Sequence, residues 1–144
     1  MIKVCFICHG NICRSPMAEY VLKNKVKDLK EEFLIVSKAT STDEIGNDMY
    51  YETKRLLNEN KIPYDYHQST QLTKIDYGKY DYFLCMDDKN IENTLKIFGG
   101  DKENKVSKLS NGKDIKDPWY TRNFDITYED VLEGCTALLE QLPV

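Results

Sequence analysis

Nine consecutive residues near the start of the chain could hold an anion and react with it. Residues 8–16 read Cys-His-Gly-Asn-Ile-Cys-Arg-Ser-Pro. Gly10 and Asn11 are residue types that tolerate a positive φ, so the chain can curl tightly there. A curled loop that runs into the start of a helix points several backbone N–H groups at one spot, where the positive end of the helix dipole adds to their attraction. We therefore predict a phosphate-binding loop over residues 8–15.

Two side chains would give this loop a reaction to perform. Arg14 offers a planar guanidinium that matches a phosphate group, and it is one of only three arginines, against 17 lysines. Cys8 would lie at the mouth of the anion site, in surroundings that favour a thiolate. A thiolate beside a bound phosphate group can attack phosphorus and form a cysteinyl-phosphate intermediate. Ser15 could donate a hydrogen bond to this sulfur, cap the following helix, or do both.

Such a reaction also needs an acid that protonates the leaving oxygen and then acts as a base toward water. Residues 110–126 are predicted to form a long loop, and loops of this length are uncommon unless they are functional. The loop contains Asp114, Asp117 and Asp125, and their spacing alone does not select one of them. Asp117 precedes a proline, which restricts it to extended or turn geometry.

The elements that must position this loop alternate between strands and helices. The short, β-branched run over residues 2–7 predicts a buried parallel strand, and apolar residues at helical spacing predict a helix from Ser15 to about Leu29. Further along, the pattern predicts a strand over 33–36, a helix over 48–60, a strand over 81–86, a helix capped by Asp88, an edge strand over 105–109 and a helix from Thr127.

This alternation predicts the fold class. The whole chain, residues 1–144, is expected to form a single α/β domain: a three-layer α/β/α sandwich with a four-stranded, mainly parallel sheet. Ligands of such sheets bind beyond the C-terminal ends of the strands. The phosphate-binding loop, which follows the first strand, would lie there.

Composition excludes several classes of function. The chain carries 24 acidic and 20 basic side chains, a net charge of −4, which argues against non-specific nucleic-acid binding. No apolar run approaches the roughly 18 residues of a membrane span, and the first residues lack a signal peptide, so we expect a cytoplasmic protein without a membrane partner. The two histidines are far apart in sequence, so no metal site is expected. We also expect no cofactor and a monomeric state.

The five cysteines are predicted to be free thiols, because their number is odd and nothing indicates export. Cys5 and Cys8 have the spacing of a redox or zinc motif, but three steps along a strand put them on opposite faces. Cys85 and Cys135 lie in apolar patterns and are expected in the core.

The sequence resembles the low-molecular-weight protein tyrosine phosphatases. The likeness lies in residues 8–19, Cys-His-Gly-Asn-Ile-Cys-Arg-Ser-Pro-Met-Ala-Glu, and in Asp-Pro-Trp-Tyr at 117–120. The order and length of the expected elements agree over essentially the whole chain. The early position of the loop separates the chain from the larger tyrosine phosphatases, whose signature lies late in the catalytic domain.

The resemblance implies a role for each central residue. Cys8 would be the nucleophile and Arg14 the phosphate clamp. Asp117 would be the general acid and then the general base. Asn11 would hold the shape of the loop, and Ser15 would donate a hydrogen bond to the thiolate. The substrates would be tyrosine-phosphorylated proteins or peptides, and inorganic phosphate and similar oxyanions would also bind.

The resemblance also indicates the walls of the cleft. Ile12, Trp119 and Tyr120 would contact the phenyl ring of the substrate. Members of the family often place an aromatic residue in the loop that corresponds to residues 39–47, but here that stretch has none and carries two acids. The cleft is therefore expected to be more open and more acidic on that side. His9, at the variable position after the nucleophile, either adds positive charge when protonated or is an ordinary residue of the rim.

Three further positions match the family less completely. Cys13 is either a redox guard that forms a disulfide with Cys8 under peroxide or a structural thiol. His67 would support the loop asparagine, although Thr70 stands where the family has an arginine in this support network. Asp87 follows a buried strand as in the family, but it could equally be a helix cap.

Three other functions fit the sequence less well than a tyrosine phosphatase does. An arsenate reductase would need further cysteines on a mobile segment, and the corresponding region offers Cys85 alone. Protein arginine phosphatases favour threonine at the position of Ile12, where an apolar side chain suits a phenyl ring better. A catalytically silent phosphate-binding module would be expected to lack Cys8, Arg14 or Asp117.

Overall fold

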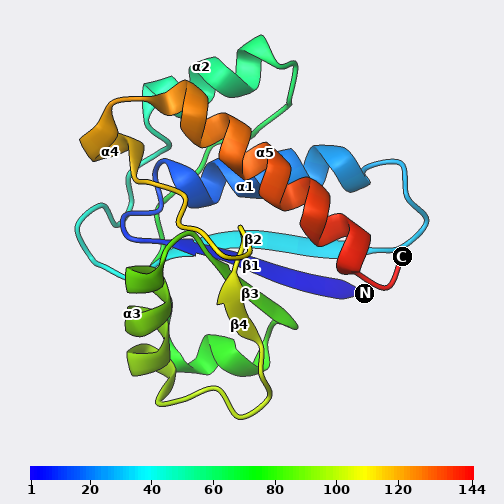
Figure 1. Ribbon diagram of the computed structural model, residues 1–144, viewed down its shortest axis with the longest axis vertical. Coiled ribbons are helices and arrows are strands. Elements are labelled where there is room, and N and C mark those ends of the chain that lie inside the picture. The colour runs from blue at the N-terminus through cyan, green and yellow to red at the C-terminus, as the bar shows by residue number, and fades with distance from the viewer.

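A parallel sheet forms the centre of the computed structural model, which describes all 144 residues. Its four strands lie in the order β2-β1-β3-β4, and each neighbouring pair is parallel. The strands are β1 (Ile2–Cys8), β2 (Phe33–Ala39), β3 (Tyr82–Cys85) and β4 (Val106–Lys108). The predicted α/β class is confirmed, and the weak fourth strand is an edge strand as expected (Figure 1).

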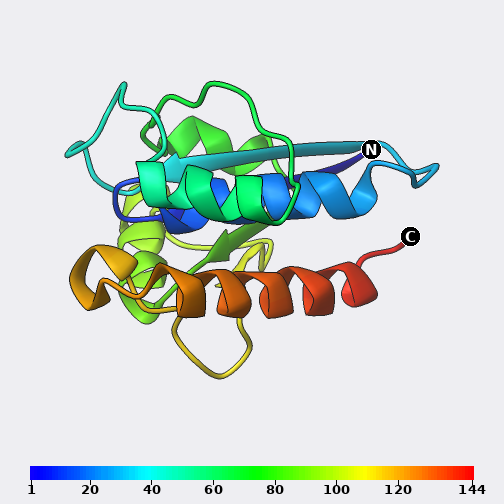
Figure 2. The same cartoon turned by 90° about the horizontal axis from the view of Figure 1, so that it is seen from above.

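Helices cover both faces of this sheet, which gives three layers. One face carries α1 (Arg14–Val26), α2 (Tyr51–Glu59) and α5 (Phe124–Gln141), and the other carries α3 (Asp88–Phe98) with the 3-10 helix η1 (Lys74–Gly78). Seen from above, α1 and α5 run side by side along the sheet (Figure 2). Both termini lie at the end of the molecule that is remote from α4 (Pro118–Thr121).

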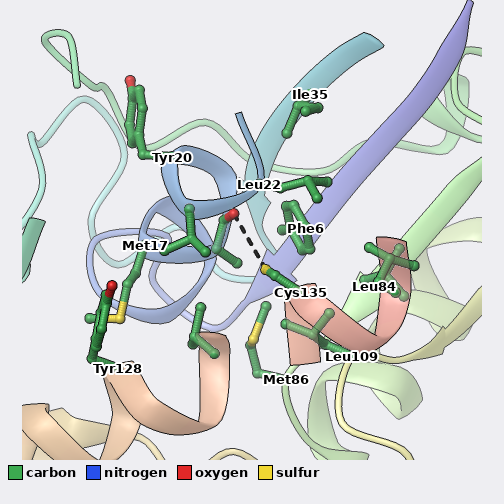
Figure 3. Packing of buried hydrophobic residues seen from close by; sticks show 14 of the residues in the cluster. Phe6, Met17, Tyr20, Leu22, Ile35, Leu84, Met86, Leu109, Tyr128 and Cys135 are labelled. Atoms are coloured by element: carbon green, nitrogen blue, oxygen red, sulfur yellow. Dashed lines mark hydrogen bonds between the residues drawn. The ribbon is translucent and has the colours of Figure 1, made fainter. Parts of the chain in front are cut away.

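The central strand β1 divides its side chains between two cores. Val4, Phe6 and Cys8 belong to the larger core under α1, α2 and α5, whereas Cys5 and Ile7 belong to the smaller one under α3. Figure 3 shows Phe6 within the larger core, close to α1 and to Cys135 of α5. Cys5 and Cys8 thus lie on opposite faces, as period-two alternation predicts, and cannot form one redox or metal site.

Two helix starts differ from prediction. Helix α1 begins at Arg14, its N-cap is Cys13, and no side chain caps it, so Ser15 is not the cap. Helix α5 begins at Phe124 rather than Thr127, because Asn123 caps it by accepting from the backbone N–H of Ile126.

Other helix ends in the structure also differ from the predicted ones. Asp87, not Asp88, caps α3, and Gly99 ends that helix in the left-handed conformation. Helix α1 ends at Val26, short of the predicted Leu29. Helix α2 begins only at Tyr51, because Asp48 accepts hydrogen bonds from the backbone N–H groups of Met49 and His67.

None of the helices is both long enough and apolar enough to span a bilayer.

Candidate active site

The phosphate-binding loop connects β1 to α1 at the C-terminal edge of the sheet, as predicted. Asn11 has a φ of 60°, the left-handed conformation that the tight curl requires. Gly10 does not adopt a positive φ, so the reason given for its place in the loop is wrong. A Cβ atom at Gly10 would lie 3.4 Å from Cγ of Glu44, an ordinary van der Waals contact, so the structure shows no steric need for glycine there.

The sulfur of Cys8 is the endpoint of a short hydrogen-bond chain. It accepts from the backbone N–H of Asn11 at 3.2 Å, and its Sγ lies 3.0 Å from Oγ of Ser15. The Nδ2 of Asn11 donates to the same Ser15 oxygen at 2.7 Å. Because that oxygen already accepts a hydrogen bond, the hydroxyl hydrogen of Ser15 is free to point at the sulfur. Donors arranged in this way stabilise a thiolate.

A second segment holds the loop from outside. The Nε2 of His67 lies 2.7 Å from the backbone oxygen of Asn11, and the hydroxyl of Ser69 donates to the backbone oxygen of Gly10 at 2.8 Å. The backbone N–H of Thr70 donates to Oδ1 of Asn11 at 3.2 Å, which fixes the orientation of that amide. The support expected from His67 is thus present without the family's arginine, since Thr70 contributes its backbone rather than its side chain.

Arg14 is buried and tightly held, with only 3% of its side chain exposed. Its Nη1 donates to Oδ2 of Asp87 at 2.6 Å and to the backbone oxygen of Ile115 at 2.8 Å. Burial by itself lowers the pKa of Arg14, but the negative charges of Cys8, Asp87 and Asp117 outweigh it and raise the pKa. The guanidinium therefore stays charged and fixed beneath the loop.

Asp87 performs both of the roles that the sequence left open. Its Oδ1 accepts from the backbone N–H of Asn90 and caps α3, while its Oδ2 binds Arg14. Asp87 and the carbonyl of Ile115 are the site residues that sequence reasoning did not assign. The sequence signals for Asp87 are its place directly after a buried strand, whose end points to the same edge of the sheet, and its match to the family at that position.

Asp117 is the acid of the long loop that reaches the pocket. Its Oδ2 lies 3.5 Å from Nη2 of Arg14, and its Oδ1 accepts from the backbone N–H of Trp119 at 3.0 Å, which caps α4. Asp114 binds Lys108 instead, and Asp125 lies near Arg55, so neither lines the pocket. The tertiary structure thereby selects among three carboxylates that the sequence did not distinguish.

The pocket has two unlike walls above the loop. Trp119 and Tyr120 form the apolar wall with Ile12, while Asp43 and Glu44 form the opposite one. The segment 39–47 is therefore acidic at the pocket, as expected from its sequence.

Tyr50 does not line the pocket, but it packs against Trp119 of the apolar wall on the side away from the pocket. Its ring packs edge-to-face on Trp119 at 5.0 Å between centroids. Arg122 donates to the hydroxyl of Tyr50 and to the backbone oxygen of Trp119, and its guanidinium lies over both rings. This contact fastens the loop that carries Asp117 to the start of α2.

Two residues of the phosphate-binding loop, His9 and Cys13, do not contact the sulfur of Cys8 through a hydrogen bond. His9 is exposed at the rim, where its Nε2 lies 2.8 Å from Oδ2 of Asp43. Cys13 is buried, and burial together with the neighbouring Cys8 raises its pKa to about 12, so it is a thiol at neutral pH. Burial likewise raises the pKa of Cys85 and of Cys135 to about 12, in keeping with core thiols. All five cysteines are free.

Replacement of Asp87 by asparagine should weaken the fold when no phosphate is bound. The change leaves the buried guanidinium of Arg14 without its shortest ionic partner, which we expect to cost about 2 kcal/mol and to lower Tm by roughly 4–8 °C. Thermal unfolding with and without inorganic phosphate measures this. The deficit should shrink when phosphate is present, because the anion supplies charge to the same guanidinium.

Asp88→Asn is the matched control, because the neighbouring aspartate is 79% exposed and binds only Lys108. It should leave Tm and phosphate affinity close to those of the unmodified protein. Equal Tm values for the two variants would contradict the role assigned to Asp87.

Comparison with known proteins gives consistent results over the whole chain. The family model described as low molecular weight phosphotyrosine protein phosphatase matches residues 3–143. The low molecular weight protein-tyrosine-phosphatase PtpA of Staphylococcus aureus is 34% identical over 147 aligned positions, which cover 99% of this chain and 94% of the relative.

Two solved structures show how far the likeness extends. SP-PTP, a low molecular weight protein tyrosine phosphatase from Streptococcus pyogenes, is 39% identical with a TM-score of 0.93 over 100% of this chain and 95% of that one. The Drosophila arginine phosphatase DARP is 26% identical, with a TM-score of 0.88 over 99% of each chain. Similar folds therefore occur in phosphatases named for two different substrates.

Proposed function

The chain belongs to the low-molecular-weight phosphotyrosine protein phosphatase family, and on this premise we propose that Cys8, Arg14 and Asp117 carry out the hydrolysis of phosphotyrosine monoesters in proteins. The observation that supports this most strongly is the convergence of all three in one pocket, with Ser15 and Asn11 donating toward the sulfur of Cys8. Residues 1–144 would act as one catalytic domain.

In the first step, the phosphate group of the substrate binds within the loop. Its non-bridging oxygens accept hydrogen bonds from the loop N–H groups and from Arg14, which stabilise the charge of the transition state. The thiolate of Cys8 attacks phosphorus in line with the tyrosyl oxygen, so that the S–P bond forms as the P–O bond breaks. Asp117 gives its proton to the departing oxygen, and tyrosine leaves neutral.

In the second step, water takes the place of the tyrosyl oxygen. The carboxylate of Asp117 accepts a proton from this water, whose oxygen attacks phosphorus. The S–P bond breaks, the thiolate of Cys8 is restored and inorganic phosphate leaves. Ser15 and the N–H of Asn11 stabilise the thiolate both as the starting nucleophile and as the leaving group.

Cys13 is the residue that we propose as a redox guard. If peroxide oxidises Cys8 to a sulfenic acid, the thiol of Cys13 could displace water and form a disulfide, which a cellular thiol would reduce again. The raised pKa of Cys13 makes this capture slow, because the thiolate is the attacking form. The monomeric state and the cytoplasmic location stay predictions from the sequence.

A side-by-side comparison of three substrates tests the proposed function. We expect a phosphotyrosine peptide to be hydrolysed faster than the matching phosphoarginine peptide, because Ile12, Trp119 and Tyr120 offer apolar surface to a phenyl ring. Arsenate with excess thiol should give no reductive turnover, since Cys85 is fully buried and cannot relay a disulfide. Phosphate release and thiol consumption are the measurements.

Phosphoarginine hydrolysis is the second candidate, favoured by the likeness to DARP. A faster rate on phosphoarginine than on phosphotyrosine would replace the proposed substrate while leaving the mechanism in place. Sustained thiol-dependent reduction of arsenate would contradict the mechanism itself.

A further inference from the structure

The acidic wall of the pocket has no part in the reaction just described, and it faces the space beside the bound phosphate. We propose that Asp43 and Glu44 select phosphotyrosine substrates that carry arginine or lysine next to the phosphorylated residue. This inference rests on the proposed function and names the class of sequence that the same site prefers.

The segment that carries the two acids is fixed against the phosphate-binding loop. The backbone N–H of Thr40 donates to the oxygen of Cys8 at 3.0 Å, and the N–H of Ser41 donates to the oxygen of His9 at 3.1 Å. Glu44 lies beside Gly10, since its Cγ is 3.4 Å from the position that a Cβ atom of Gly10 would occupy. The two carboxylates are therefore held at the pocket rather than carried on a free loop.

These carboxylates are poorly neutralised by the protein itself. Glu44 forms no ion pair in the structure, and its Oε2 accepts only from the neutral amide of Asn47 at 2.6 Å. Asp43 has His9 as its one basic partner, and its side chain is 66% exposed, whereas Glu44 is half-buried. Arg14 is the one permanent cation of the pocket, but it lies at the floor, where the substrate phosphate and Asp87 occupy it.

The charge distribution changes once a substrate is bound. The phosphate dianion then meets Arg14 and the loop N–H groups, and the rim above it is left with the net negative charge of Asp43 and Glu44. The opposite wall, Trp119 and Tyr120, is uncharged. A cationic side chain beside the phosphotyrosine gains attraction from the acidic wall, and an acidic one meets repulsion.

The size of the expected peptide preference depends on how far the carboxylates of Asp43 and Glu44 are exposed to solvent. Exposed ion pairs are individually weak and screened by salt. Two of them at one rim should favour an arginine-flanked peptide over a glutamate-flanked one by about 3- to 10-fold in kcat/KM at low ionic strength. The preference should shrink when salt is raised well above physiological strength, because neither carboxylate is deeply buried.

The experiment compares two short phosphotyrosine peptides that are identical except for their flanking residues, arginine on both sides in one and glutamate on both sides in the other. The ratio of their kcat/KM values is measured for the unmodified protein and for the double variant D43N/E44Q. We expect the ratio to fall toward 1 in the double variant. The single variant Glu44→Lys, which adds a cation over Gly10, should lower the ratio further.

The control is E133Q/E140Q, which removes the same charge from exposed positions of α5 that are outside the pocket. It should keep both the activity and the ratio of the unmodified protein. Equal rates on the two peptides, or a ratio that survives in D43N/E44Q, would overturn the inference while leaving the proposed function intact. Failure to hydrolyse either peptide would instead contradict the proposed function and the inference with it.

Discussion

Replacement of Cys8 by serine should abolish turnover of phosphotyrosine peptides, with a loss of about three orders of magnitude or more. A serine hydroxyl is not ionised at neutral pH, and no base lies within the hydrogen-bond chain to take its proton, because Ser15 and Asn11 both donate toward this position. The change is nearly isosteric, so the pocket should still bind inorganic phosphate. Phosphate release and phosphate-dependent thermal stabilisation measure the two properties separately.

Cys85→Ser is the matched control for this substitution. Cys85 is equally buried, but it faces the smaller core, where Oγ1 of Thr94 lies 3.6 Å from its sulfur and can accept the new hydroxyl. This variant should lose some stability and keep its activity. Turnover by Cys8→Ser at more than a few per cent of the rate of Cys85→Ser would rule out a cysteinyl-phosphate intermediate on Cys8.

The second large effect is expected for Asp117→Asn, which should slow the hydrolysis of phosphotyrosine peptides by about 10²- to 10³-fold. Asparagine has no proton to give to the tyrosyl oxygen, a poor leaving group. The loss should be much smaller for para-nitrophenyl phosphate, whose leaving group departs without a proton. Asparagine can still accept from the N–H of Trp119, so the cap of α4 is preserved.

Asp125→Asn provides the comparison, because this aspartate belongs to the same predicted loop, yet its side chain is 72% exposed and lies near Arg55. Its rates on both substrates should be unchanged. An equal slowing of both substrates by Asp117→Asn would mean that the aspartate positions Arg14 rather than transferring a proton.

The order of the strands and helices and the place of the reactive loop could be predicted because both depend on local patterns. Apolar periodicity identifies β1 and α1, and the residue types between them indicate an anion site. Helix ends were less predictable, since Thr127 and Asp88 are good cap residues but Asn123 and Asp87 occupy the cap positions. Neighbouring polar residues compete for the same N–H groups, and tertiary contacts decide between them.

Contacts between distant parts of the chain could not be read from spacing. Arg14 and Asp87 are separated by 73 positions, and neither residue type indicates from the sequence that the other is its partner. The choice of Asp117 over Asp114 likewise depends on how the long loop folds back toward the pocket. Gly10 shows the reverse case, because a residue type that tolerates a positive φ does not adopt one in the structure, whereas Asn11 beside it does.

The segment around Thr70 contributes to the chemistry without placing a side chain in the pocket. From the amide of Thr70, hydrogen bonds run through Asn11 and Ser15 to the sulfur of Cys8, with separations of 3.2, 2.7 and 3.0 Å. The N–H of Thr70 and the amide of Asn11 both donate in the direction of the sulfur, and the bond dipoles add along the whole relay when the hydroxyl of Ser15 donates to Cys8. A peptide group outside the pocket thus helps to hold the Ser15 hydroxyl beside the sulfur of the nucleophile.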